Sequence, residues 1–327
     1  MGFAPELLKF FWPLNQPLDP GGRVTQKPLS VVDFIEQHSI TGNGVFDVLR
    51  IINVLINEKL LVPFVNQGGP FGQTFYSLAN PTDDQIAYGT FDCLALGFVF
   101  IRENFERSVI PLIFSTKERE AVGTGFLVAE DSILTARHCI DESLSMRIPG
   151  LSVSSLRSIK VPGENLNMDI ALLTFNDELV PGARPLRFGQ ANLLDDVMVM
   201  GYPPIKGFHT VQVSETAQVA GFLHSSVGQL IGKANSYLEK QDYLLITARV
   251  KGGNSGGPVL NRRGEVVGMV VGQPAGENLE PDSIGFGAAL SSEEITKFLE
   301  AKASDLDGVR FEIREDALIF SGALDAI

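Results

Sequence analysis

The sequence predicts a mainly β protein that begins with a smaller module of mixed helix and strand. From about residue 107 onward, short apolar runs alternate with turn-forming Gly, Pro, Asn and Asp, as expected of strands. Between residues 30 and 61, the apolar residues instead recur at helical spacing. The chain has 327 residues, which is long for one domain. We therefore expect a small α+β module, a connector and a larger β domain.

The module covers residues 1–85. Residues 1–28 are rich in Pro, Gly and aromatic side chains without a clear period, so an irregular arm is expected. The following elements are a helix over 31–38, a longer helix over 45–61, and a hairpin of 63–65 with 74–78. This order of elements is similar to a winged helix. Residues 86–106 are the connector, where the pattern leaves helix and strand both open.

The charge of the chain argues against nucleic acid as a partner. The net charge is −13 at pH 7, and residues 1–85 hold 5 cations against 8 anions. A helix that reads a DNA groove needs cations around it to contact phosphates. We therefore expect the module to contact protein, such as an activator, and keep DNA binding as the alternative.

No export signal or membrane segment is expected. Residues 1–20 lack a basic start followed by an unbroken apolar core, and no apolar run approaches 18 residues. The two cysteines, Cys93 and Cys139, are too few for a disulfide scaffold and are expected to be buried thiols. No residue spacing predicts a metal site, and no cofactor is expected. These features predict a cytoplasmic protein.

A glycine-rich loop around one serine is the strongest local signal. Residues 252–258 read Gly-Gly-Asn-Ser-Gly-Gly-Pro, between apolar runs typical of strands. Glycine permits backbone N–H groups to turn inward and a substrate to approach, because it has no Cβ. Acyl transfer needs a nucleophile, here Ser255, beside donors for an oxyanion, and such a loop can supply both. Taken alone, the loop fits equally a glycine turn with a solvent-facing serine.

Two upstream segments supply a base and an acid for this serine. His138 ends the segment Thr-Ala-Arg-His, and Asp169 begins the run Asp-Ile-Ala-Leu-Leu. They lie 31 residues apart, and 86 residues separate Asp169 from Ser255. A serine hydroxyl is a poor nucleophile without a base, and a histidine base works best when a carboxylate fixes its tautomer.

The three segments together resemble the motifs of the chymotrypsin-like (trypsin-like) serine peptidases. The stretch 253–258 is similar to the Gly-Asn-Ser-Gly-Gly-Pro of the bacterial high-temperature-requirement (Deg-type) branch. The resemblance covers about residues 107–300. It implies a domain over 107–302 made of two six-stranded antiparallel β-barrels, about 107–190 and 191–302. Within the domain, residues 210–222 are expected to supply a strand, 235–242 a surface loop and 292–300 a capped amphipathic helix. Residues 303–327 would be a tail, too short for the PDZ domain of that branch.

The resemblance also implies roles for individual residues. Ser255 would be the nucleophile, His138 the general base and then acid, and Asp169 the group that orients His138. The N–H groups of Gly253 and Ser255 would form the oxyanion hole. The implied protein is an intracellular bacterial serine endopeptidase that acts on proteins or peptides, with activity or location set by residues 1–85. The alternatives are a catalytically inert adaptor and a DNA-binding regulator fused to a protease.

Two finer expectations concern activation and specificity. Relatives activated by cleavage carry an aspartate at the position of Asn254, where it pairs with a new N-terminus, so no activation of that kind is expected here. Order in the loop could depend on the module, a partner or a ligand. The residues expected to line the substrate pocket are Arg249, Val270, Val271 and Gln273. Arg249 would place a cation near the pocket and so indicates acidic substrates. Glutamate-specific relatives, however, carry a histidine at the position of Val270, so a small apolar substrate residue is favoured.

Overall fold

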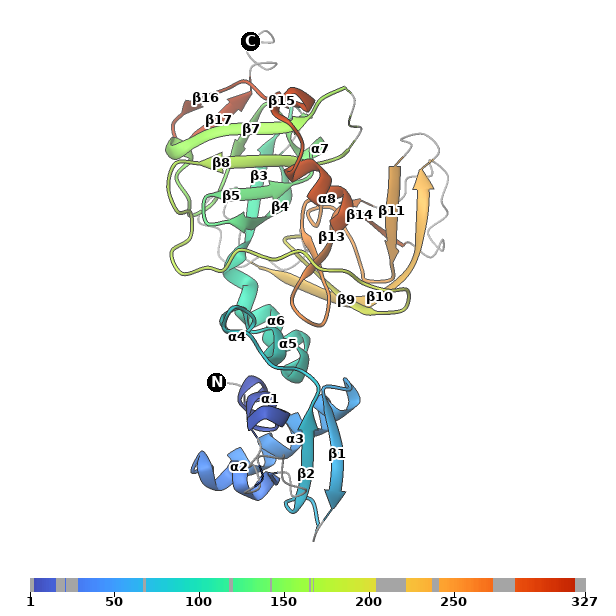
Figure 1. The fold of residues 1–327 in the computed structure, drawn as a ribbon. Coiled ribbons are helices and arrows are strands. Elements are labelled where there is room, and N and C mark those ends of the chain that lie inside the picture. The colour runs from blue at the N-terminus through green and yellow to red at the C-terminus, as the bar shows by residue number, and fades with distance from the viewer. Residues whose placement is uncertain are drawn as a thin grey trace. The chain divides into compact units, whose positions relative to one another are not determined.

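The structure is a computed structural model, and two compact units make up the chain (Figure 1). Unit 1 is Met1–Ile101 and unit 2 is Arg102–Ile327. The described residues are 3–15, 21, 29–66, 69–117, 120–141, 143–164, 166, 168–203, 222–236, 241–272 and 286–320. Each unit is taken by itself below.

Unit 1 combines short helices with one hairpin around its own apolar core. Its helices and strands, within the described residues, are α1 (Ala4–Phe10), α2 (Val31–Gln37), α3 (Asn43–Asn57), β1 (Leu61–Asn66), β2 (Gln73–Ser77), α4 (Asp83–Tyr88) and α5 (Thr90–Leu96). The two predicted helices and the antiparallel hairpin are confirmed, although α3 begins earlier than expected. Ser30 caps α2 through a capping box with Asp33. The connector is helical, with α6 (Phe98–Phe105) following α5 after Gly97.

The expectation of an irregular arm is wrong for residues 4–10, which form α1. Leu7, Leu8 and Phe11 are fully buried and pack in the core of unit 1. With Ala4, these residues have the spacing of one helical face, which the neighbouring aromatic residues obscured in the sequence. Pro5 stands near the helix start, where the missing N–H costs nothing.

Unit 2 is almost entirely antiparallel β-structure. Its elements, within the described residues, are β3 (Val109–Ser115), β4 (Glu120–Ala129), β5 (Ser132–Thr135), α7 (His138–Asp141), β6 (Ser145–Arg147), β7 (Leu156–Pro162), β8 (Ala171–Phe175), β9 (Asp196–Gly201), β10 (His224–Ser236), β11 (Gln241–Ile246), β12 (Pro258–Leu260), β13 (Val266–Gly272), β14 (Gly287–Ser291), α8 (Ser292–Leu299), β15 (Leu306–Gly308), β16 (Phe311–Arg314) and β17 (Ala317–Phe320).

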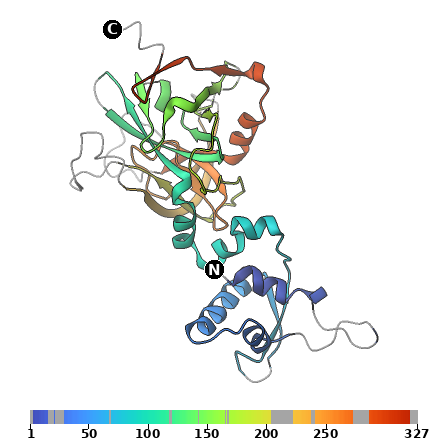
Figure 2. The same cartoon turned by 90° about the vertical axis from the view of Figure 1, so that its left-hand side faces the viewer.

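These strands form two antiparallel lobes, which confirms the predicted chymotrypsin-like class. The second lobe is a closed six-stranded barrel in the order β10-β11-β14-β13-β12-β9. The first is a nine-stranded sheet in the order β15-β7-β8-β5-β4-β3-β6-β17-β16. It is wider than the expected six-stranded barrel because β15 pairs with β7 and β17 pairs with β6. The red C-terminal strands accordingly lie along the green ones (Figures 1 and 2).

The predicted tail is thus a structural part of the first lobe. Leu318 is fully buried and Phe320 is 5% exposed, and both pack in the first lobe's core with residues such as Met146 and Phe175. The second lobe has a separate core inside its barrel. Helix α8 was predicted correctly and is capped by Ser291.

Two loop and strand expectations fared differently. In the loop expected over 235–242, the four described residues are strand, because Asn235 pairs with Asp242 and Ser236 with Gln241 across β10 and β11, and residues 237–240 lie outside the described residues. The strand expected over 210–222 falls, up to residue 221, outside the described residues. Within the described residues, no helix has both the length and the apolar character needed to cross a membrane.

Replacing Leu318 tests whether the C-terminal strands hold the first lobe together. Leu318→Ala should lower the free energy of unfolding by about 2–5 kcal/mol, because it opens a cavity in a closed core. Urea unfolding followed by far-UV circular dichroism measures this, since the single tryptophan, Trp12, lies in unit 1. The control is Ile313→Ala on the paired strand, where the side chain is 40% exposed and should matter much less. Equal effects of the two variants would contradict the assignment.

Candidate active site

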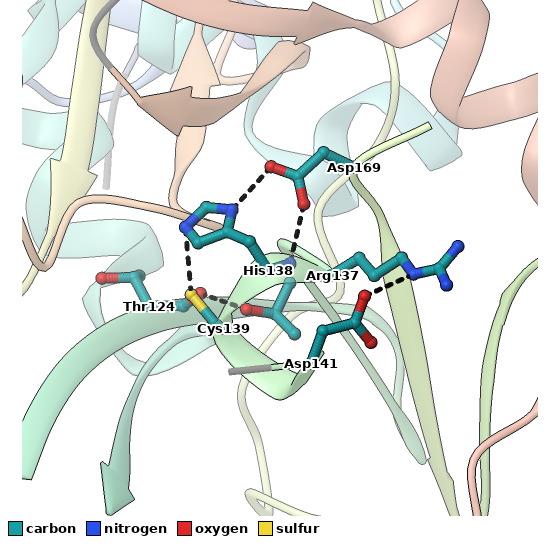
Figure 3. A network of polar contacts seen from close by, with 7 residues as sticks. Thr124, Arg137, His138, Cys139, Asp141 and Asp169 are labelled. Carbon is teal, nitrogen blue, oxygen red and sulfur yellow. Dashed lines mark hydrogen bonds and ion pairs between the residues drawn. The ribbon is translucent and has the colours of Figure 1, made fainter. Parts of the chain in front are cut away.

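A histidine and an aspartate lie close together at the ends of two neighbouring strands of the first sheet. His138 begins α7 directly after β5, and Asp169 lies just before β8. Strands β5 and β8 pair with Thr135 opposite Ala171, so the sheet register itself brings the two residues together. The carboxylate accepts two hydrogen bonds: His138 N donates to Oδ1 at 2.8 Å, and Nδ1 contacts Oδ2 at 2.6 Å (Figure 3). Both the backbone and the ring of His138 are therefore fixed by one side chain.

The surroundings of His138 favour its charged form. Burial alone lowers the pKa of the imidazole, but the hydrogen bond that the ring donates to Asp169 and the contact with the Cys139 thiol outweigh it and raise this pKa to about 11. The thiol Sγ lies 3.6 Å from Nε2, so the ring sits between a carboxylate and a sulfur (Figure 3). Cys139 is a half-buried free thiol, and Cys93 is a buried one.

Ser255 belongs to the second lobe but is anchored to the first. It is half-buried on the loop between β11 and β12, and its carbonyl accepts a hydrogen bond from Thr124 N of β4 at 2.8 Å. A β-carbon placed on Gly123 would lie 3.1 Å from Cys139 Sγ and 3.5 Å from Ser255 O, so the loop lies beside the start of α7. Among the described residues, no hydrogen bond joins the Ser255 hydroxyl to His138 Nε2.

The loop presents two backbone N–H groups without partners. Asn254 N donates to Lys251 O at 3.0 Å, and Gly253 has a φ of +94°, as in a type II turn whose third residue must be glycine. Within the described part of the chain, the N–H groups of Gly253 and Ser255 have no acceptor. Unpaired donors on neighbouring residues are suited to bind a developing negative charge.

The glycine after the serine allows the close packing of the loop. A β-carbon on Gly256 would lie 2.1 Å from Thr124 O, a distance that no other residue could tolerate. Gly256 N donates to Val270 O at 2.7 Å, and Val270 N donates to Gly257 O at 2.8 Å. The loop is thus held between β4 of the first lobe and β13 of the second.

Asn254, the residue directly before Ser255, has a buried polar side chain. It is only 4% exposed, and its Oδ1 has no hydrogen-bond partner among the described residues. The same oxygen would lie 2.7 Å from a β-carbon on Gly201, so the space around it is tightly packed. A buried acceptor without a donor has a free-energy cost of roughly 1–3 kcal/mol.

The residues expected to line the substrate pocket are spread over different environments. Arg249 is exposed, and its backbone N donates to Ser226 Oγ at 2.8 Å. Val270 is fully buried in the core of the second lobe, whereas Val271 is half-buried. Gln273 lies outside the described residues.

A separate cavity of about 500 Å³ lies elsewhere in unit 2. Arg102, Arg107, Tyr202 and Phe222 are among its lining residues, which do not include His138, Asp169 or Ser255. The Tyr202 hydroxyl donates to Val109 O at 3.1 Å, and burial, followed by the charge of Glu106, raises the pKa of this phenol. No three His, Cys, Asp or Glu residues gather as a metal site in the described part of the chain.

Sequence reasoning missed two features of the site. Thr124 is fully buried and bonds to the serine loop twice, through its N and its Oγ1. Its position between Gly123 and Gly125, where any side chain would clash, was a signal of close packing against another segment. The contact of Cys139 with the imidazole was also not foreseen, since adjacent residues share no predictable side-chain direction at a helix start.

Comparisons with known proteins agree with this geometry. Residues 123–269 match the family described as the trypsin-like peptidase domain. The chain is 30% identical over 178 residues to Protease Do-like 2, chloroplastic, of Arabidopsis thaliana, which covers 52% of this chain and 27% of the relative. It is 27% identical over 207 residues to Serine protease HTRA1 of Xenopus laevis, covering 58% of this chain and 38% of the relative. The chain thus spans well under half the length of these relatives.

One solved structure is similar to part of the chain. The Rv3671c protease from M. tuberculosis, in its active form, has a TM-score of 0.46 and 22% sequence identity, covering 61% of this chain and 82% of the solved one. The family match takes in the segments of His138, Asp169 and Ser255, on strands whose pairing was described above. Residues 123–269 of this chain thus match the trypsin-like peptidase domain, and the chain is similar over this region to the Do-like and HtrA serine proteases.

Proposed function

We propose that the protein is a serine endopeptidase that hydrolyses peptide bonds through an acyl-enzyme. Ser255 Oγ attacks the substrate carbonyl, and its proton passes to His138 Nε2. The N–H groups of Gly253 and Ser255 bind the oxyanion of the tetrahedral intermediate. His138 then gives its proton to the leaving amine, and water repeats the sequence to release the acid product.

The observation that carries this proposal is the double hydrogen bond from His138 to Asp169. One carboxylate fixes both the main chain and the Nδ1 side of the ring, which leaves Nε2 as the nitrogen for proton transfer. The serine loop lies against the adjacent strand with two unpaired N–H donors. An adaptor without catalysis has no need for a fixed imidazole tautomer, so we prefer the enzyme.

The contacts of His138 with Asp169 and Cys139, which raise its pKa to about 11, favour a protonated imidazole in the absence of substrate. A protonated ring cannot accept the proton of Ser255. Catalysis proceeds from the neutral fraction of the ring, after Nε2 exchanges its contact with the Cys139 thiol for the Ser255 hydroxyl. Substrate binding, which removes water from the site, is the natural trigger for that exchange.

We further propose that unit 1 is a winged-helix-like module that contacts a protein and sets the location or activity of the peptidase. Its surface carries large exposed apolar side chains on α3 and on the hairpin, including Phe46, Val62 and Phe64, which are 71%, 42% and 51% exposed. Its negative balance of charge disfavours DNA. We propose a bacterial, cytoplasmic setting, which the two free thiols support.

Removing the nucleophile tests the central claim. Ser255→Ala should lower kcat by about 10⁴-fold or more, because water must then replace the nucleophile. A fluorophosphonate probe should label wild type and not the variant, and proteome-wide N-terminal profiling of the two should give the cleavage preference. Ser304→Ala, at an exposed serine, is the matched control. A wild type that takes no label and cleaves nothing would favour the adaptor.

The pH dependence tests the role of Asp169. The folded-state pKa of His138 lies above its ordinary 6.5, so its contacts contribute stability below about pH 6.5 that is lost as the pH rises towards 11. Activity should therefore keep rising above pH 8 as the ring becomes neutral. In Asp169→Asn the pKa should fall, as ¹⁵N NMR of labelled histidine measures. A wild-type imidazole that is already neutral at pH 8 would contradict this picture.

A charge at Asn254 tests the absence of activation by a new N-terminus. Asn254→Asp should reduce both stability and kcat/KM, because burying a charged carboxylate in place of the neutral amide has a free-energy cost unless a cation pairs with it. Asn176→Asp, which adds the same charge on an exposed turn, should change neither. The measurements are urea unfolding and peptide hydrolysis. Higher activity of Asn254→Asp would mean that a cation does reach this position.

A further inference from the structure

Thr124 is a fully buried residue whose side chain carries a polar hydroxyl, and such a group requires hydrogen-bond partners. It lies in β4, is fully buried, and stands at the point where the pairing of β4 with β5 stops, at Gly125 opposite Thr135. Beyond that point the partner of β4 is the serine loop, since Thr124 N donates to Ser255 O at 2.8 Å. The loop therefore continues the edge of β4 where β5 ends, and Thr124 is the residue at the junction.

The hydroxyl of Thr124 links two segments of the second lobe. Tyr202 N donates to Oγ1 at 3.0 Å, and Oγ1 donates to Gly253 O at 2.6 Å. A backbone N–H can only donate and a carbonyl can only accept, so the hydroxyl proton must point at Gly253. The result is a directed chain of hydrogen bonds from the end of β9 to the loop before the serine.

Three successive peptide planes of the loop are fixed in consequence. The plane after Gly253 is held by Thr124 Oγ1 at its carbonyl and by Lys251 O at its N–H. The plane after Ser255 is held by Thr124 N at its carbonyl and by Val270 O at the N–H of Gly256. The plane between them has its carbonyl, Asn254 O, bound by Gly257 N at 2.8 Å, and its N–H, that of Ser255, has no acceptor among the described residues. Thr124 supplies both bonds that come from the first lobe.

We propose that Thr124 is a positioning residue for the oxyanion hole. By holding the carbonyls of Gly253 and Ser255, it fixes the peptide planes on either side of the plane that carries the Ser255 N–H, and the first of these planes also follows the Gly253 N–H directly. This inference rests on the proposed function. Thr124 itself touches neither the substrate nor the reacting atoms. Removing its hydroxyl takes the bonds that Thr124 supplies away from Gly253 O and Tyr202 N and leaves the Gly253–Asn254 plane held from its N–H side alone, by Lys251 O. The neighbouring N–H groups of Gly253 and Ser255 are then less firmly fixed in direction, and oxyanion binding depends on that direction.

Three variants of the full chain test the proposal. Thr124→Val keeps the shape but lacks the hydroxyl, Thr124→Ser keeps the hydroxyl, and Thr174→Val makes the same change at a buried threonine on β8. Thr124→Val should lower kcat by about tenfold to a hundredfold, less than the loss of an oxyanion donor, with KM within about twofold of wild type. Thr124→Ser should recover most of kcat, and Thr174→Val should not lower it.

A second readout separates positioning from general damage. A peptide aldehyde forms a tetrahedral adduct with the serine, and its oxygen occupies the oxyanion site, so its affinity should fall by the same factor as kcat/KM in Thr124→Val. The proposal is overturned if this variant, folded by circular dichroism, keeps kcat and aldehyde affinity within about twofold of wild type, or if only KM changes. Should Thr124→Val not fold, Thr124→Ala takes its place with the same expected losses. A wild type without peptidase activity would instead defeat the proposed function, and the inference with it.

Discussion

The carboxylate of Asp169 is the constraint on which the site depends. One oxygen binds the main-chain N–H of His138 and the other binds the ring, so the start of α7 and the imidazole are set together. Because β5 pairs with β8, the main chain at His138 and at Asp169 lies at the same end of this strand pair, whatever rotamers the two side chains adopt. The geometry of the base is therefore decided by strand register, which is strongly specified where one face of a sheet is buried. The second lobe contributes the loop that carries Ser255, which lies beside this histidine–aspartate pair.

The sequence predicted the candidate reactive residues better than the contacts that hold them in place. Short motifs around residues 138, 169 and 255 predicted the fold class, since each pairs an apolar strand with one reactive side chain. Helix α1 and the wide first sheet were not predicted, because both depend on contacts between segments far apart in the chain. The role of Thr124 was hidden for the same reason: its partners lie about 80 and 130 residues away, beyond the reach of local patterns.

The two lobes are held together internally by apolar packing, whereas the serine loop between them is held by hydrogen bonds. Each lobe has its own apolar core, and the serine loop lies between them with hydrogen bonds to both. Hydrogen bonds that cross from β4 to the loop are few, short and buried, so small changes in packing between the lobes act directly on the N–H groups of the loop. Unit 1, with a third core of its own, can evolve new contacts while leaving this chemistry unchanged.

The order of strands in the first sheet has a consequence during protein synthesis. Strands β15 and β17 follow the entire second lobe in the chain, yet they pair with β7 and β6 and complete the first core with Leu318 and Phe320. While residues 306–320 are still inside the ribosome, the first lobe lacks part of its core even though His138, Asp169 and Ser255 have all been translated. A nascent chain therefore completes the first core only after residues 306–320 have left the ribosome, later than the segments that carry His138, Asp169 and Ser255.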